Sequence, residues 1–121
     1  MTLTDDEYVA QYEASVAHWR ARNRAFLDSC EHIDVPRMNP LVEAKFDSNA
    51  TLQRFEVYPE ALTAYDNIEL EQVIAQVLEG SRQQVAEQVQ NLLTKFLRFG
   101  EPGFDPNALG VPMVMPPSPD D

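Results

Sequence analysis

Two long stretches with the hydrophobic spacing of a helix flank a short stretch with the alternation of a β-strand. In the first, side chains recur at steps of three and four residues, and all but one are apolar: Val9, Tyr12, Val16, Trp19, Asn23, Phe26 and Cys30. This heptad spacing predicts a helix that packs along a partner helix. We call its first six positions the seam: Val9, Tyr12, Val16, Trp19, Asn23 and Phe26.

The first helix has a clear start signal. Thr4 and Glu7 form a T-x-x-E capping box, in which each side chain accepts a hydrogen bond from the other residue's backbone N–H. The helix is predicted to run to about Ser29. Asn23 either sets the register of the partner helices, as a polar seam residue does, or lies at a solvated edge of the interface.

The middle of the chain alternates with the period of a strand. Val42, Ala44 and Phe46 share one face, turn-forming residues occupy 47–50, and a second alternating run spans 52–58. This pattern predicts an antiparallel β-hairpin, to which residues 33–35 would add a short third strand. Two strands alone are only marginally stable, so the hairpin needs a packing partner.

A second long helix follows the hairpin. Asp66 and Glu69 have the spacing of another capping box, and the apolar stripe continues from Ile68 to about Phe99. Gly80 interrupts this stripe. It marks a bend, a close approach of another backbone, or a solvated helix middle, and we favour the last interpretation.

The lengths of these helices predict a homodimer. At 1.5 Å per residue they would span roughly 40 Å and roughly 50 Å, more than the width of a domain this small. A single chain therefore has difficulty covering both apolar faces, and a second copy would complete the core. The expected fold class is α+β, with a two- or three-stranded sheet between the long helices.

The end of the chain has a different composition. From residue 100 onward it holds six of the nine prolines, three of the four glycines and no basic residue. Proline blocks helices and sheet ladders, so this segment is predicted to be a flexible, disordered tail. We expect a single domain over residues 1–100 and a tail over 101–121, whose removal after Glu101 would leave thermal stability nearly unchanged.

The charge and composition of the chain limit which classes of partner it is expected to bind. The net charge of −11 disfavours DNA binding, because nucleic-acid affinity comes mostly from Lys and Arg on phosphates. The chain has no apolar run of membrane-spanning length and no basic-then-apolar start, so no membrane partner is expected. With one cysteine and no possible internal disulfide, a cytoplasmic location is expected.

One basic group is nevertheless a candidate for phosphate contacts. Arg20 and Arg24 lie one helical turn apart on one face, whereas Arg22 points largely away. Together with Arg54 on the second strand, they are the arginines that would hold a phosphate backbone. Alternatively they pair with acidic neighbours, as on an ordinary solvated helix, and we favour this interpretation.

Catalytic and metal-binding patterns are missing from the sequence. His18 and His32 have no partner at metal-ligand spacing, and no glycine-rich phosphate loop is present. Cys30 falls on the helical stripe, where a small buried apolar side chain is the ordinary expectation. We therefore expect no catalytic residue, no metal and no cofactor.

The order of elements resembles the YbaB family of small bacterial nucleoid-associated proteins. The resemblance rests on LVEAKFDSNATLQRFEVYPEAL, on DNIELEQVIAQVLEGSRQQVAEQV and on the end GFDPNALGVPMVMPP. Leu70, Val73 and Ile74 match the start of the family's last helix. Two glycine positions of the family, before the first strand and in the hairpin turn, are occupied by residues 37–40 and 47–50 here.

The resemblance implies a dimer whose helices project from a shared sheet. Several members of the family bind DNA with little sequence preference, and some actinobacterial relatives are associated with specialised secretion systems. Because function belongs to surface chemistry, fold and dimerisation transfer better than DNA binding. We expect a non-enzymatic homodimer that acts on an unidentified protein partner as an adaptor or accessory factor, for which the relatives suggest a link to secretion. The alternative is a nucleoid-associated protein that binds DNA without strong sequence preference.

Overall fold

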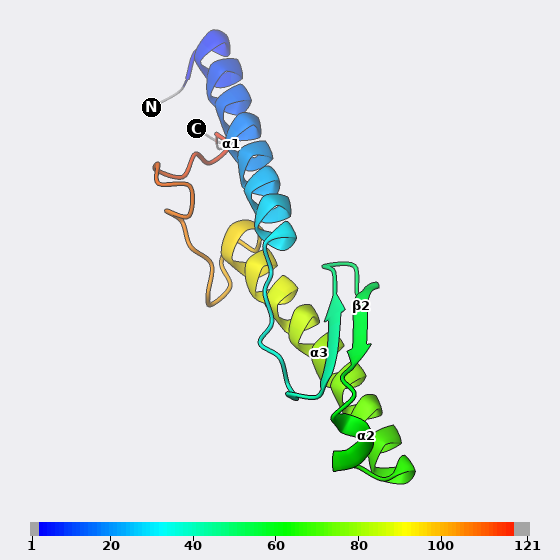
Figure 1. Ribbon diagram of the computed structural model, residues 1–121. Helices are drawn as coiled ribbons and strands as arrows, with labels where there is room; N and C mark the ends of the chain where they lie inside the picture. The colour runs from blue at the N-terminus through cyan, green and yellow to red at the C-terminus, as the bar shows by residue number, and fades with distance from the viewer. Residues whose placement is uncertain (1–2, 118–121) are drawn as a thin grey trace. The chain divides into compact units, whose positions relative to one another are not determined.

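The computed structural model describes residues 3–117. Its elements are α1 (Asp5–Glu31), β1 (Val42–Phe46), β2 (Leu52–Val57), α2 (Ala61–Ala64) and α3 (Asn67–Leu97) (Figure 1). The prediction of an α+β chain, with two long helices and a small antiparallel sheet, is confirmed. Within the described residues the sheet has two strands, so residues 33–35 do not add the third. In the same range, no helix has both the length and the apolar character to cross a membrane.

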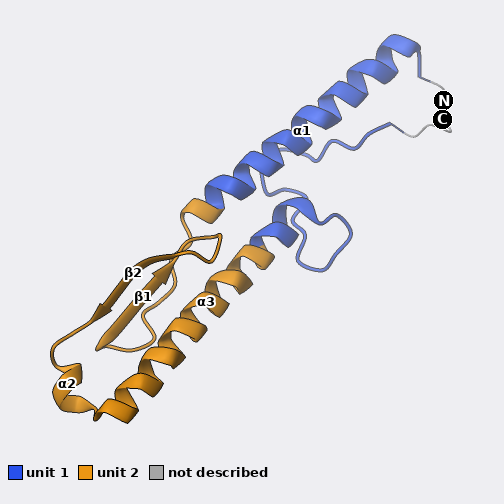
Figure 2. Cartoon of the chain, turned by 90° about the vertical axis from the view of Figure 1, so that its right-hand side faces the viewer, with its two compact units in different colours: residues 1–29, 92–121 blue, residues 30–91 orange. Residues whose placement is uncertain are grey.

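The chain divides into two compact units (Figure 2). Unit 1 comprises residues 1–29 and 92–121, and unit 2 comprises residues 30–91. The predicted domain over 1–100 and flexible tail over 101–121 stay predictions, and residues 118–121 of that tail lie outside the described part. The described tail residues do, however, make specific contacts in unit 1, which are given below.

Both long helices begin at the predicted capping boxes. At α1 the Glu7 N–H donates to Thr4 Oγ1 at 3.1 Å, and the Thr4 N–H donates to Glu7 Oε2 at 3.3 Å. At α3 the Glu69 N–H donates to Asp66 Oδ1 at 2.7 Å, with the reciprocal bond at 3.3 Å. Each box satisfies backbone donors that an α-helix leaves unpaired at its start, which is why both helices begin there.

The hairpin turn is built without glycine. Ala50 adopts a φ of +61°, in the region that normally favours glycine. The Asp47 carboxylate supports this turn, because its Oδ1 accepts the N–H groups of Asn49 and Thr51, both at 2.9 Å. Side-chain hydrogen bonds thus stabilise a conformation that an alanine would otherwise adopt at a cost.

The core of unit 2 is small. Val42 and Ala61 are completely buried, and Val77 and Val85 of α3 are 3% exposed. The hairpin lies along α3 in both views (Figures 1 and 2). Packing on α3 therefore supplies the support that a lone two-stranded sheet lacks.

At Gly80 the absence of a side chain lets Met38 pack against the surface of α3. The helix continues without a break through this position, and a Cβ added there would lie 2.6 Å from Met38 Sδ. The glycine thus makes room for Met38 of the loop before β1, so the favoured interpretation of a solvated helix middle is wrong. No second backbone lies against this position in the described chain. Any larger residue at position 80 requires the Met38 side chain to move.

Candidate functional site

Two clusters of buried polar side chains stand out, one in each unit. The first, in unit 1, surrounds Arg22 of α1, whose side chain is completely buried. We call Arg22, His18, Trp19 and Phe104, with the carbonyl groups that Arg22 binds, the Arg22 cluster. A buried arginine requires hydrogen-bond acceptors for its donors, and this cluster supplies them from three parts of the chain.

The guanidinium of Arg22 donates four hydrogen bonds. Its Nε–H donates to His18 Nε2 at 3.0 Å, and Nη1 donates to the Phe96 carbonyl at 2.9 Å. Nη2 donates to the carbonyls of Asp105 and Pro106 at 3.0 and 2.8 Å. Arg22 therefore connects α1 to the end of α3 and to the segment that was predicted to be a flexible tail.

Aromatic rings complete this environment. The Arg22 guanidinium carbon lies 5.4 Å from the Trp19 ring centre and 4.8 Å from that of Phe104. Trp19 and Phe104 stack on each other with ring centres 6.3 Å apart. These distances are typical of cation–π contacts, which gain strength where water is excluded.

The position of Arg22 also suits the helix dipole of α3. The last four carbonyls of a helix lack intrahelical donors and carry partial negative charge. Arg22 binds one of them, at Phe96, and the Asp105 N–H donates to another, at Lys95, at 3.0 Å. A cation from α1 and an amide from the following segment thus cap the end of α3.

His18 takes part in the cluster as a neutral imidazole. Its Nε2 accepts the hydrogen bond from Arg22, so that nitrogen carries no proton in this arrangement. Burial, and then the positive charge of Arg22, lower the pKa of His18 below its usual value. A protonated His18 would lose the Arg22 bond and place two cations in contact.

We predict that acidification destabilises the protein through His18. A lowered folded-state pKa means that the unfolded state takes up the proton first as the pH falls. The contribution of neutral His18 is complete above the ordinary value of about 6.5 and is lost as the pH falls from there toward the folded-state pKa. One proton limits this slope to about 1.4 kcal/mol per pH unit.

The measurement is urea unfolding between pH 8 and pH 5, with His18→Gln as the matched control. Glutamine accepts a hydrogen bond but does not titrate, so the difference between the two proteins reports His18 alone. An identical pH dependence of both free energies of unfolding would contradict the assigned protonation state.

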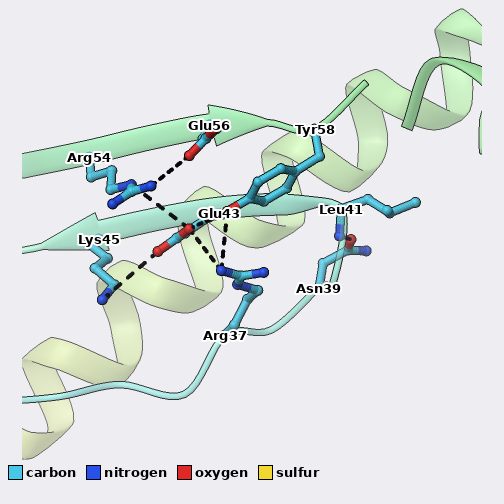
Figure 3. Close-up of polar contacts among 8 residues, drawn as sticks. All are labelled: Arg37, Asn39, Leu41, Glu43, Lys45, Arg54, Glu56 and Tyr58. Atoms are coloured by element: carbon cyan, nitrogen blue, oxygen red, sulfur yellow. Dashed lines mark hydrogen bonds and ion pairs between the residues drawn. The ribbon is translucent and has the colours of Figure 1, made fainter. Parts of the chain in front are cut away.

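The second cluster lies on the hairpin in unit 2 (Figure 3). Its centre is the Glu43 carboxylate of β1, whose side chain is 7% exposed. Oε2 of Glu43 accepts hydrogen bonds from Arg37 Nη2 at 3.0 Å and from the Tyr58 hydroxyl at 2.9 Å. The ammonium of Lys45 and Nε of Arg54 lie 3.9 Å from this carboxylate. We call Glu43, Arg37, Lys45, Arg54 and Tyr58 the Glu43 cluster.

The register of the hairpin explains why these charges gather. Glu43 lies directly opposite Glu56, and Lys45 lies opposite Arg54, so each cross-strand pair has like charges. Such pairs are destabilising unless other charges compensate. Arg54 does so by binding Glu56 at 2.8 Å while approaching Glu43 on the diagonal.

The chemistry of this cluster is that of a satisfied ion network. The hydrogen bond from Tyr58 is the main cause that lowers the pKa of Glu43, and the nearby cations add to it, while burial opposes them. The same bond raises the pKa of Tyr58. Glu43 is therefore an anion at neutral pH, and its lowered pKa makes it a poor proton acceptor.

The predicted seam residues differ in exposure. Val9 and Tyr12 are 52% and 53% exposed, and Asn23 is also exposed. Val16, Trp19 and Phe26 are half-buried, with Trp19 partly covered by Phe104. The role of the seam in a dimer stays a prediction.

The three predicted phosphate contacts, Arg20, Arg24 and Arg54, belong to different units, and their role stays a prediction. Arg20 and Arg24 are exposed on α1 in unit 1, whereas Arg54 lies in unit 2, paired with carboxylates of the hairpin. Arg22 points away from Arg20 and Arg24, as expected, but it is buried and bound to carbonyls rather than solvated. The expected pairing of Arg20 and Arg24 with acidic neighbours on the helix stays a prediction.

Sequence reasoning missed Arg22, Glu43 and Tyr58 as cluster centres. For Arg22 one signal was present: Phe104 is a large aromatic residue in a proline- and glycine-rich segment, which suggests an anchor. For Glu43, the alternation placed it and Lys45 on one face of the hairpin. Only the register and the position of Arg37 bring three cations around it.

The described residues form no metal-binding cluster and leave no buried polar side chain without a hydrogen-bond partner. Across residues 3–117, no three metal-binding side chains come together, and no buried side-chain nitrogen or oxygen lacks a hydrogen-bond partner. Comparisons with protein-family models, with curated proteins and with solved structures gave no match.

Proposed function

We propose that this protein is a non-enzymatic homodimer that acts through contacts with other proteins, as an adaptor or accessory factor. The observation that carries the proposal is the distribution of apolar side chains. Six apolar residues are buried within residues 3–117, whereas twelve large ones are exposed. Contiguous exposed apolar patches mark interaction sites, and three of the twelve, Tyr8, Val9 and Tyr12, lie within about one turn of α1.

The state of the polar clusters supports a structural rather than a catalytic role. Arg22 donates to backbone carbonyls, and the Glu43 carboxylate accepts from Arg37 and Tyr58, all within the same chain. A catalytic acid or base needs a free proton site within reach of a substrate. The YbaB-like order of elements supports a dimer as well.

The same clusters make DNA binding the weaker alternative. Arg22 and Arg54 are engaged with groups of this chain, which leaves Arg20 and Arg24 as the exposed pair on α1. These two arginines belong to a chain whose net charge is −11. Phosphate contacts supply most non-specific affinity for DNA, so this balance favours a protein partner.

The proposal is tested by light scattering at micromolar concentration and by DNA retardation at physiological salt. We expect twice the single-chain mass and duplex affinity weaker than ~10⁻⁵ M. A single-chain mass for the folded protein would contradict the homodimer. Tight duplex binding that Arg20→Ala with Arg24→Ala abolishes would favour the DNA alternative instead.

A further inference from the structure

Helix α1 has one face covered by its own chain and another left free. Ser15, His18 and Arg22 are buried, and their spacing of three and four residues places them on one face. At about 100° per residue, the line through Val9, Val16 and Asn23 lies roughly 130° away around the helix. The Arg22 cluster therefore covers one side of α1 and leaves this line outside it.

The free face combines apolar and charged side chains. Val9 and Leu27 are both 52% exposed, and they lie at the two ends of the face. Glu13 and Arg20 lie between them and are exposed. They are seven residues apart, which is about two helical turns, so both project from the same side of α1.

The order of these charges determines which partner fits. In a parallel pair of α1 helices, Glu13 would face Glu13 and Arg20 would face Arg20, which is repulsive on both counts. In an antiparallel pair, each Glu13 would face Arg20 of the other copy. A twofold axis produces such a self-complementary contact, because the same patch serves both subunits.

We infer that α1 binds α1 of a second copy in an antiparallel arrangement, with Glu13 of each chain paired to Arg20 of the other. The twofold axis lies between Val16 and Ala17, midway between these two residues. Asn23 then lies at the side of the contact rather than at its centre. This inference rests on the proposed homodimer and adds its surface, direction and register.

The test is charge reversal, measured by sedimentation equilibrium in 50 mM salt, where screening is weak. Glu13→Arg and Arg20→Glu alone each convert two attractive contacts of the dimer into repulsive ones. We expect each to raise the dimer dissociation constant about tenfold, since paired surface charges contribute up to about 1 kcal/mol each. The double variant should return to within about threefold of the wild type, because it restores both pairs.

Two controls separate this inference from the proposed function. The first is Glu87→Arg, which makes the same charge change as Glu13→Arg at an exposed position of α3 and should leave the dissociation constant nearly unchanged. The second is circular dichroism, which checks that every variant is folded. If the wild type is a dimer and the single reversals have no effect, or the double variant is not restored, the antiparallel α1 contact is wrong and the homodimer stands. If the folded wild type is a monomer throughout, both proposals fail.

Discussion

Replacing Arg22 with alanine is expected to lower the free energy of unfolding by about 3 kcal/mol. The substitution removes four hydrogen bonds and takes the Arg22 donor from the carbonyls of Phe96 and Pro106. The Asp105 carbonyl loses Arg22 as well but keeps the hydrogen bond from the Ala108 N–H at 3.3 Å. A buried acceptor that loses its partner lowers the free energy of unfolding by about 1–3 kcal/mol. Water that enters the space left by the side chain can bind these carbonyls, so the total loss is smaller than the sum over all of them. The substitution also removes the cation from between the rings of Trp19 and Phe104.

Urea unfolding provides the measurement, and Arg24→Ala is the matched control. Arg24 is two residues away on the same helix and is exposed, so its loss should change stability by less than about 0.5 kcal/mol. Arg22→Lys should fall between the two, because an ammonium lacks the planar fork that reaches several carbonyls at once. Equal effects of Arg22→Ala and Arg24→Ala would show that the Arg22 cluster does not stabilise the fold.

Ending the chain at Glu101 is expected to lower the melting temperature by about 10 °C, which corresponds to about 2–3 kcal/mol for a chain of this size. The truncation removes the Phe104 ring and the two carbonyls that Arg22 Nη2 binds. It also removes the Asp105 amide that caps Lys95 at the end of α3. This expectation reverses the one from composition, which predicted almost no loss.

A chain that ends at Gly110 is the control, because it retains Phe104, Asp105 and Pro106. Its melting temperature should fall much less. Combining truncation at Glu101 with Arg22→Ala should cost less than the two separate losses added together, since both remove the same contacts. Nearly unchanged melting of the Glu101 truncation would restore the prediction of a flexible tail from residue 101 onward.

The elements of this fold could be predicted from the sequence because their causes are local. Thr4 with Glu7 and Asp66 with Glu69 determine where α1 and α3 begin, since a capping box acts within one turn. The alternation of residues 42–46 and 52–57 determines the hairpin for the same reason. Helix α2, at Ala61–Ala64, was not predicted, because four residues carry no periodic signal.

The sites depended on tertiary structure because their causes are distant in the chain. Arg22 is separated by more than seventy residues from the carbonyls that it binds. Its helical position shows only that it points away from Arg20 and Arg24. The charge around Glu43 depends on hairpin register and on Arg37, which no pattern of alternation specifies.

The sequence by itself determined the long helices, their capped starts, the antiparallel hairpin and the acidic character of the protein. These follow from periodicity, from side chains within one turn of each other and from composition. Tertiary structure decided which polar residues are buried and which side of α1 stays free. A guanidinium is buried only where several backbone carbonyls converge, and that convergence exists only once the end of α3 and residues 104–106 meet α1.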